Sequence, residues 1–236
     1  MCFSPFADLA GGAVVGAIGV DTARHAGRRA DWPLASLPLI FAGHFLTETL
    51  VWWGHDGVVS DVVEARATWL YLLVALVVVP FIVPIAVTIA VPVASRRRAM
   101  TPFCVLGGVI AAVMLVAVVR GPVTSQVQGH HIAYGVNLRF GGQLTALYVV
   151  ATCGVMLASR NRVFVAFGMV NLAVVALLGW LMVSAFISLW CAWAAVTSVA
   201  IDLYIRRAGT SRGRVPSGSK PSQLRLVASA EQGIES

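Results

Sequence analysis

His44 and Glu48 place an imidazole and a carboxylate four residues apart, inside the segment from Phe41 to Trp53. Helical spacing puts both side chains on one face, and His55 returns to that face about two turns after Glu48. The surrounding apolar run is long enough to cross a bilayer, where ionisable groups are costly unless they face a bundle interior, a cavity or one another. We therefore predict that Glu48 and His44 form the acid–base core of a functional site.

Two cysteines and a loop histidine extend this core to a metal-ligand set. Thiolate, imidazole and carboxylate groups are the ligands of zinc and other transition metals, so the predicted ligands are Cys2, His44, Glu48, His131 and Cys191. The same groups could transfer protons without a metal. No spacing in the chain matches a metalloprotease or zinc-ribbon pattern.

Each of these groups also has a structural interpretation. His44 and Glu48 can form an ion pair or an interhelical hydrogen bond that fixes packing. Cys2 and Cys191 can form a disulfide, because both are expected to face an oxidising compartment. His131 can be a solvated side chain on an exposed loop.

The composition indicates an all-α integral membrane protein. Of the 236 residues, 58% are hydrophobic and 11% are charged, against about 25% charged in soluble domains. Several apolar stretches reach the ~20 residues that span a hydrocarbon core. They do not alternate as the strands of a membrane barrel do. The start lacks the positive region of a cleavable signal peptide, so the first span is expected to be retained.

The apolar stretches divide into seven predicted spans: 5–22, 34–54, 67–92, 103–119, 140–158, 163–182 and 186–205. Glycines in the first span are expected to allow close helix approach, and Pro80 and Pro84 to kink the third. Asp202 is expected to pair with Arg206, one turn further on. Residues 1–207 would form the transmembrane domain, and 208–236, rich in Gly and Ser, a flexible basic cytoplasmic tail.

The basic residues predict the orientation. With seven spans, only Arg66, Arg120 and Arg139 of the 17 Lys and Arg residues fall on one side. The other side is therefore cytoplasmic by the positive-inside rule, which puts the N-terminus outside and the C-terminus inside. Because the net charge of +7 gathers at span ends and no nucleic-acid-binding motif is present, nucleic acid is not expected as a partner. The loop 121–139 would then lie outside, at the same level as Glu48.

Three segments resemble an uncharacterised bacterial family of multi-pass membrane proteins whose members begin Met-Cys-Phe-Ser. They are Met1 to Ser4, Pro38 to Trp52, and Trp190 to Ser198. The resemblance covers most of residues 1–205 and implies a seven-pass membrane protein of unknown activity. Cys2, His44, Glu48 and Cys191 stand in the matching motifs.

A likeness to seven-pass zinc hydrolases, which include alkaline ceramidases and adiponectin-receptor-like proteins, concerns architecture only, because the last span lacks their histidine pair. We expect a polar pocket that opens outward. If the protein is an enzyme, zinc or another transition metal, or acid–base chemistry, would act on a lipid-like substrate reached through the bilayer. The alternatives are a non-enzymatic transporter, sensor or partner-binding protein, and an isoprenoid cyclase with Glu48 as proton donor.

Overall fold

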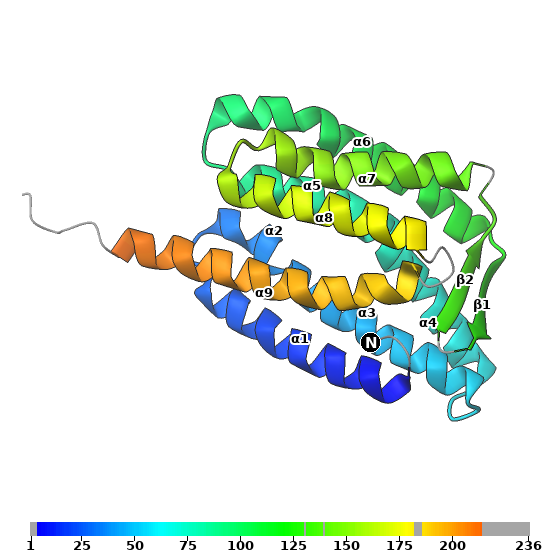
Figure 1. The fold of residues 1–236 in the computed structure, drawn as a ribbon. Helices are drawn as coiled ribbons and strands as arrows, with labels where there is room; N and C mark the ends of the chain where they lie inside the picture. Colours follow the sequence, from blue (N-terminus) through cyan, green and yellow to red (C-terminus); the bar gives the residue numbers. More distant parts are fainter. Residues whose placement is uncertain (1–3, 130, 139, 182–185, 214–236) are drawn as a thin grey trace, which may run out of the picture.

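The computed structural model of the chain describes residues 4–129, 131–138, 140–181 and 186–213, and the side chains of these except 131, 178–181, 186–192 and 209–213. Long helices lie side by side, and a β-hairpin covers one end of them (Figure 1). The helices are α1 Pro5–His25, η1 Arg29–Asp31, α2 Trp32–Ala35, α3 Leu37–His55, α4 Asp61–Leu73, η2 Val74–Val78, α5 Val79–Ala90, α6 Ala94–Arg120, α7 Gly141–Ala158, α8 Arg162–Leu181 and α9 Phe186–Gly213.

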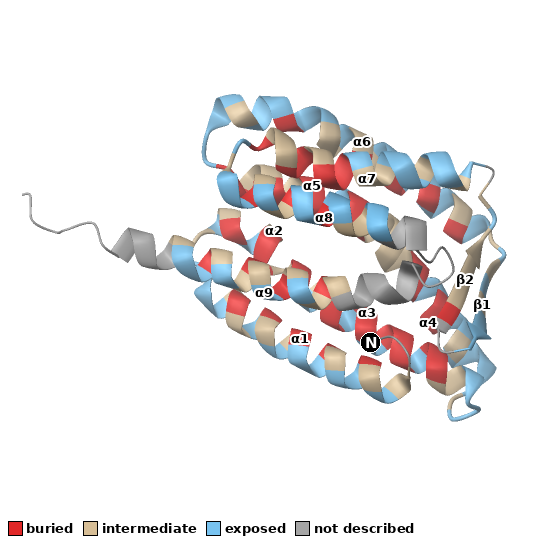
Figure 2. Cartoon of the chain, in the orientation of Figure 1, coloured by how far each residue is buried: buried red, intermediate tan, exposed pale blue. Residues whose placement is uncertain are grey.

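Several of the helices could cross a membrane by their length and composition. In the described part of the chain, five helical segments are long and apolar enough to cross a bilayer: Pro5–His25, Arg29–His55, Asp61–Ala90, Ala94–Arg120 and Gly141–Ala158. The outward face of α6 carries exposed valines at positions 105, 109, 113, 116 and 119. An apolar stripe of this length on an outer helix suits lipid rather than water. The buried core lies between the helices, centred on α3, α5, α7 and α9 (Figure 2).

Small residues bring α1 and α3 together in antiparallel order. Ser4 caps α1 by accepting a hydrogen bond from the Ala7 amide, and Pro5 begins the helix. A Cβ on Gly12 would lie 2.9 Å from the Leu46 side chain, and one on Gly19 2.7 Å from that of Leu39. The predicted close approach at these glycines is therefore confirmed.

The third predicted span is one helix with a π turn. α4 begins at Asp61, six residues before the predicted start, because the acidic segment 61–66 is already helical. In η2 the Val79 amide bonds the Val74 carbonyl, five residues back. Pro80, next in line, has no N–H for the Ala75 carbonyl, and the Tyr148 hydroxyl of α7 donates to that carbonyl instead at 3.2 Å. The Tyr148 hydroxyl thus supplies the hydrogen bond that Pro80 cannot donate to the Ala75 carbonyl.

A second carbonyl that a proline leaves without its helical donor lies against a glycine. Pro84 has no N–H to offer the Pro80 carbonyl, one turn back. Gly107 of α6 lies against that carbonyl so closely that any Cβ there would collide with it. The tight crossing of α5 and α6 therefore depends on Gly107.

The longest predicted loop forms a hairpin. β1 Val123–Gln128 and β2 His131–Val136 pair antiparallel, with Ser125 opposite Tyr134. Ile132, Tyr134 and Val136 pack against helical side chains. Valines, an isoleucine and a tyrosine at alternating positions favour strands, but this signal is short and lies among polar residues.

Ion pairs join α1 and α9 at the opposite end of the bundle. The Arg206 guanidinium donates to Asp202 at 2.8 Å, which confirms the predicted helix-end pair, and also to Asp21 of α1. The Thr22 hydroxyl bonds Asp202 as well, at 3.1 Å. α9 continues to Gly213, beyond residue 207.

Candidate functional site

His44 and Glu48 lie one turn apart on the buried side of α3. Glu48 has no exposed surface and His44 is 6% exposed. Both belong to the face of α3 that turns into the helix bundle, which is where ionisable groups are expected if this helix crosses a bilayer. Nδ1 of His44 has no hydrogen-bond partner among the described residues.

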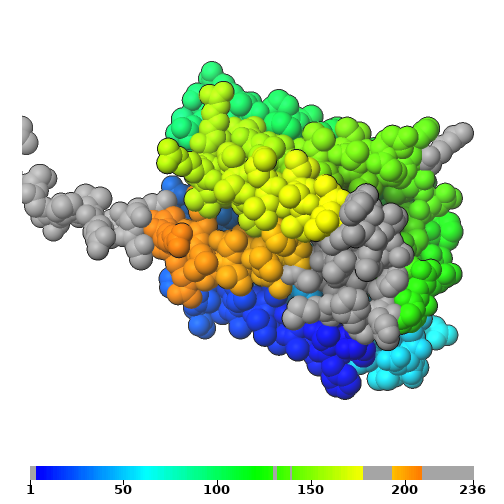
Figure 3. All heavy atoms as spheres, in the orientation of Figure 1, coloured from blue at the N-terminus to red at the C-terminus, as the bar shows by residue number. Residues whose placement is uncertain are grey.

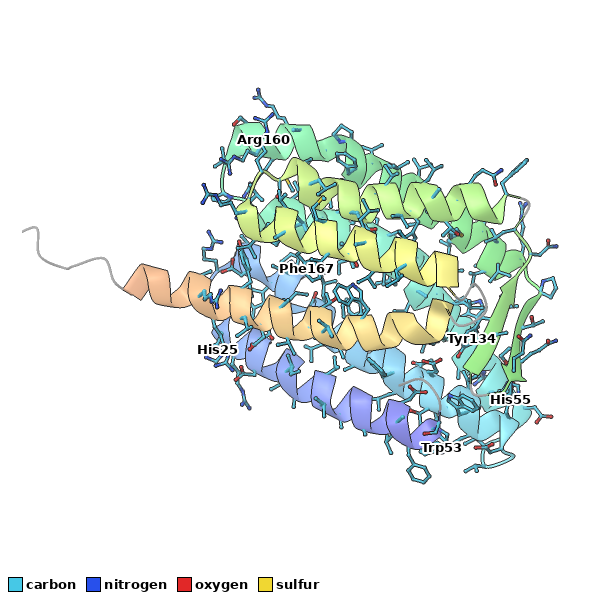
Figure 4. All side chains as sticks on the ribbon, in the orientation of Figure 1. His25, Trp53, His55, Tyr134, Arg160 and Phe167 are labelled. Atoms are coloured by element: carbon cyan, nitrogen blue, oxygen red, sulfur yellow. The ribbon has the colours of Figure 1, made fainter. Side chains whose placement is uncertain are left out.

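Two tyrosines continue from the His44 ring towards the hairpin. The His44 and Tyr71 ring centroids are 3.9 Å apart with an interplanar angle of 18°, and the Tyr71 and Tyr134 centroids are 4.1 Å apart at 15°. Parallel stacks of this kind hold rings in fixed positions. The stack therefore connects α3, α4 and β2, and it ends at Tyr134 on the hairpin that covers this end of the bundle (Figure 4).

A polar cluster fastens the hairpin to α3 and α4. The Ser125 hydroxyl donates to Oε1 of Glu64 at 3.1 Å and accepts from the Thr68 hydroxyl at 3.2 Å. Nε2 of His55 lies 3.2 Å from the Ser125 hydroxyl and 3.3 Å from Oε1 of Glu64. We call these four residues the hairpin latch.

The hairpin latch is not a hydrolase triad. In a triad the acid holds one ring nitrogen and the nucleophile meets the other. Here Ser125 and Glu64 both lie beside Nε2 of His55. The cluster therefore holds the hairpin in place rather than activating Ser125. The hairpin latch requires a glycine at position 54, because a Cβ there would collide with the Glu64 side chain.

Asp8 on α1 is a further buried acid at this end. Its carboxyl group has no exposed surface. It lies one turn before Gly12, which packs against Phe45 and Leu46, so it stands at about the level of Thr49 and Glu48. Two acids and an imidazole are thus buried at one end of the α1–α3 pair.

The other predicted ligands fall outside the described side chains. Cys2 lies outside the described residues, and only the backbone is described for His131, in β2, and Cys191, in α9. Among the residues that are described, no three His, Cys, Asp or Glu side chains converge as metal ligands. His44 and Glu48 are therefore the two predicted ligands whose side chains the structure describes. The metal site stays a prediction.

The arrangement suits proton transfer. An imidazole and a carboxylate on one helical face can accept and donate a proton, and the tyrosine hydroxyls add two further proton-bearing groups. Burial excludes bulk water, which makes each charge interaction stronger than it is in solution.

The sequence reasoning missed Asp8, Tyr71, Tyr134 and Ser125. Asp8 had a visible signal, since an acid inside a predicted span is a functional candidate. The other three had none, because aromatic and serine side chains are ordinary in such helices and loops. Their roles arise from contacts between α3, α4 and the hairpin.

A family model described as a family of unknown function (DUF6629) matches residues 1–215. No curated protein and no solved structure matches the chain. The site therefore has to be interpreted from its own chemistry.

Proposed function

The chain belongs to this family of unknown function, and from that premise we propose that it is a multi-pass membrane protein with an acid–base or metal-assisted site around Glu48 and His44. The site would act on a lipid-like small molecule. The observation that carries this proposal is Glu48, a carboxyl group with no exposed surface inside a helix that can span a bilayer. Such groups are expensive to bury and mark function by default.

The hairpin supports a closed reaction site. It lies over the end of α3 and α4, and the tyrosine stack joins it to the buried imidazole of His44 on α3. A covered site excludes water, and its opening would admit a molecule from the outer surface or the bilayer. The predicted outward-facing pocket would then be the open form.

Seven spans with the N-terminus outside form part of the proposal. α8 and α9 overlap predicted spans six and seven, and the start of α1 lies at the hairpin end of the bundle (Figure 1). The arginines support the orientation, because most of them gather at the opposite end. Cys2, His131 and Cys191 would then belong to the outer end.

Metal content tests the proposal first. Detergent-purified protein is analysed by elemental mass spectrometry beside Glu48→Gln, His44→Ala and Cys191→Ser, with Cys104→Ser as the matched cysteine control. Near-stoichiometric zinc that is lost in the three variants and kept in the control would establish a metal site. Absence of metal, together with poorly folded Glu48 and His44 variants, would make the pair structural and overturn the proposal.

Proton-coupled transport is a second candidate, favoured by the π turn η2 and the prolines that follow it. π turns occur frequently at functional sites, and this one lies immediately after the helix that carries Tyr71. The test is proton flux into vesicles that contain the protein and a pH-sensitive dye. Flux that disappears in Glu48→Gln and persists in Glu64→Gln would favour the transporter over the enzyme.

A further inference from the structure

Two neighbouring cavities lie under α8 and α9, where these helices face α3, α5 and α7, away from the site described above. The larger, of about 70 Å³, is lined mainly by aliphatic and aromatic side chains, among them Phe41, Val83 and Ile201. The smaller, of about 40 Å³, shares Phe41 and Val83 and reaches Asn171 and Trp193. Shared walls make them parts of one apolar space.

Two contacts frame this space along the two helices. At one end the Trp193 indole donates to Oδ1 of Asn171 at 2.5 Å. At the other end the Phe164 and Tyr204 ring centroids lie 4.8 Å apart. Between these contacts Phe167 of α8 lines the space, and its ring centroid lies 6.1 Å from that of Trp193 of α9 (Figure 4).

The space opens towards lipid. α8 and α9 lie side by side on the surface of the molecule (Figure 3). Val163, part of the cavity wall, is 53% exposed, and Ala200 and Thr197 on the other wall are partly exposed. An apolar opening between two outer helices of a membrane protein meets hydrocarbon chains.

Cationic groups flank one end of the space. Arg162 is exposed and directly precedes Val163 in the wall. Arg28 marks the same end, because it interacts electrostatically with Tyr204, also in the wall, but its charge is paired with Asp31 at 2.6 Å. An anionic headgroup at the membrane surface is complementary to the charge of Arg162.

We propose that the space between α8 and α9 binds several methylenes of one hydrocarbon chain of an anionic phospholipid, with its headgroup beside Arg162 at the Arg28 end. The volume favours a short stretch of an unbranched chain, because both cavities together are smaller than the ~150 Å³ apolar cavity that accepts benzene. A few methylenes enter such a space, whereas a sterol or another fused-ring lipid does not. The site is separate from Glu48 and does not depend on the activity proposed there.

The experiment measures phospholipid that stays bound to detergent-purified protein, by native mass spectrometry with anionic and zwitterionic lipids of equal chain length. Ala200→Phe and the smaller Ala200→Ile fill the space. Val199→Phe, at the adjacent outward-facing position, is the matched control. We expect wild type and Val199→Phe to keep an anionic phospholipid. Both Ala200 variants should bind it about tenfold to thirtyfold more weakly, because several methylenes are excluded.

The charge is tested by Arg162→Gln beside Arg98→Gln, an exposed arginine that lines neither cavity. The preference for anionic over zwitterionic lipid should fall about fivefold in the first variant and stay unchanged in the second. Equal retention by Ala200→Ile and Val199→Phe would overturn the proposed chain site. Equal loss of preference in both arginine variants, or retention of a neutral lipid instead, would overturn the headgroup assignment.

Discussion

Tyr71 is the ring through which the buried imidazole of His44 meets the hairpin. It is 1% exposed and stacks on both His44 and Tyr134. Tyr71→Ala should lower the free energy of unfolding by about 3–5 kcal/mol, because it leaves a ring-sized cavity. Tyr71→Phe keeps the stack and should cost about 1 kcal/mol. Thermal unfolding in detergent measures both, and equal losses would show that the hydroxyl matters more than the ring.

Ser125 is the centre of the hairpin latch, since its hydroxyl meets His55, Glu64 and Thr68. Ser125→Ala should destabilise the hairpin by about 1–3 kcal/mol, because partly buried polar groups lose their partner. Hydrogen exchange of the hairpin amides should then quicken about fivefold or more, while the cores of α6 and α7 keep their protection.

The neighbouring exposed Gln126 supplies the control for the latch. Gln126→Ala changes the strand surface without touching the cluster and should leave exchange nearly unchanged. The same rate in both variants would mean that the latch does not hold the hairpin.

At the scale of elements, the crossing of α5 and α6 depends on one glycine. Gly107→Ala places a methyl group against the Pro80 carbonyl and should cost about 1–3 kcal/mol by overpacking. Gly108→Ala is the matched control, because nothing lies within 4 Å of a Cβ there. It should be neutral or stabilise by about 0.5–1 kcal/mol through helix propensity. Chemical denaturation compares them, and a neutral Gly107→Ala would contradict the crossing.

The sequence predicted the long helices better than it predicted the elements near the hairpin. Continuous apolar runs predicted the long helices, because backbone groups in hydrocarbon must be satisfied within the helix. The hairpin at 123–136 and the early start of α4 were not predicted. Their polar residues resemble any extramembranous loop, and they acquire structure by packing on α3 and α4.

At the scale of the whole molecule, the proposed orientation makes a direct prediction. Green fluorescent protein fused after residue 236 should fluoresce, because that end would be cytoplasmic. Alkaline phosphatase inserted in the hairpin turn at Gly129 should be active, because the turn would lie outside. With the two reporters exchanged, green fluorescent protein at Gly129 should not fluoresce and alkaline phosphatase after residue 236 should be inactive. Activity of the phosphatase at the C-terminus would reverse the orientation and move the Glu48 site to the cytoplasmic half.

The sequence by itself determined that this is a helical, membrane-compatible chain, that it belongs to a family of unknown function, and that His44 and Glu48 share a helical face. These properties follow from local composition and helical period, which the chain carries without its neighbours. Only the tertiary structure decided that Tyr71 and Tyr134 stack on the His44 ring, that Asp8 is buried at the same end, and that α8 and α9 leave an apolar space. Contacts between distant segments depend on packing, which no local pattern encodes.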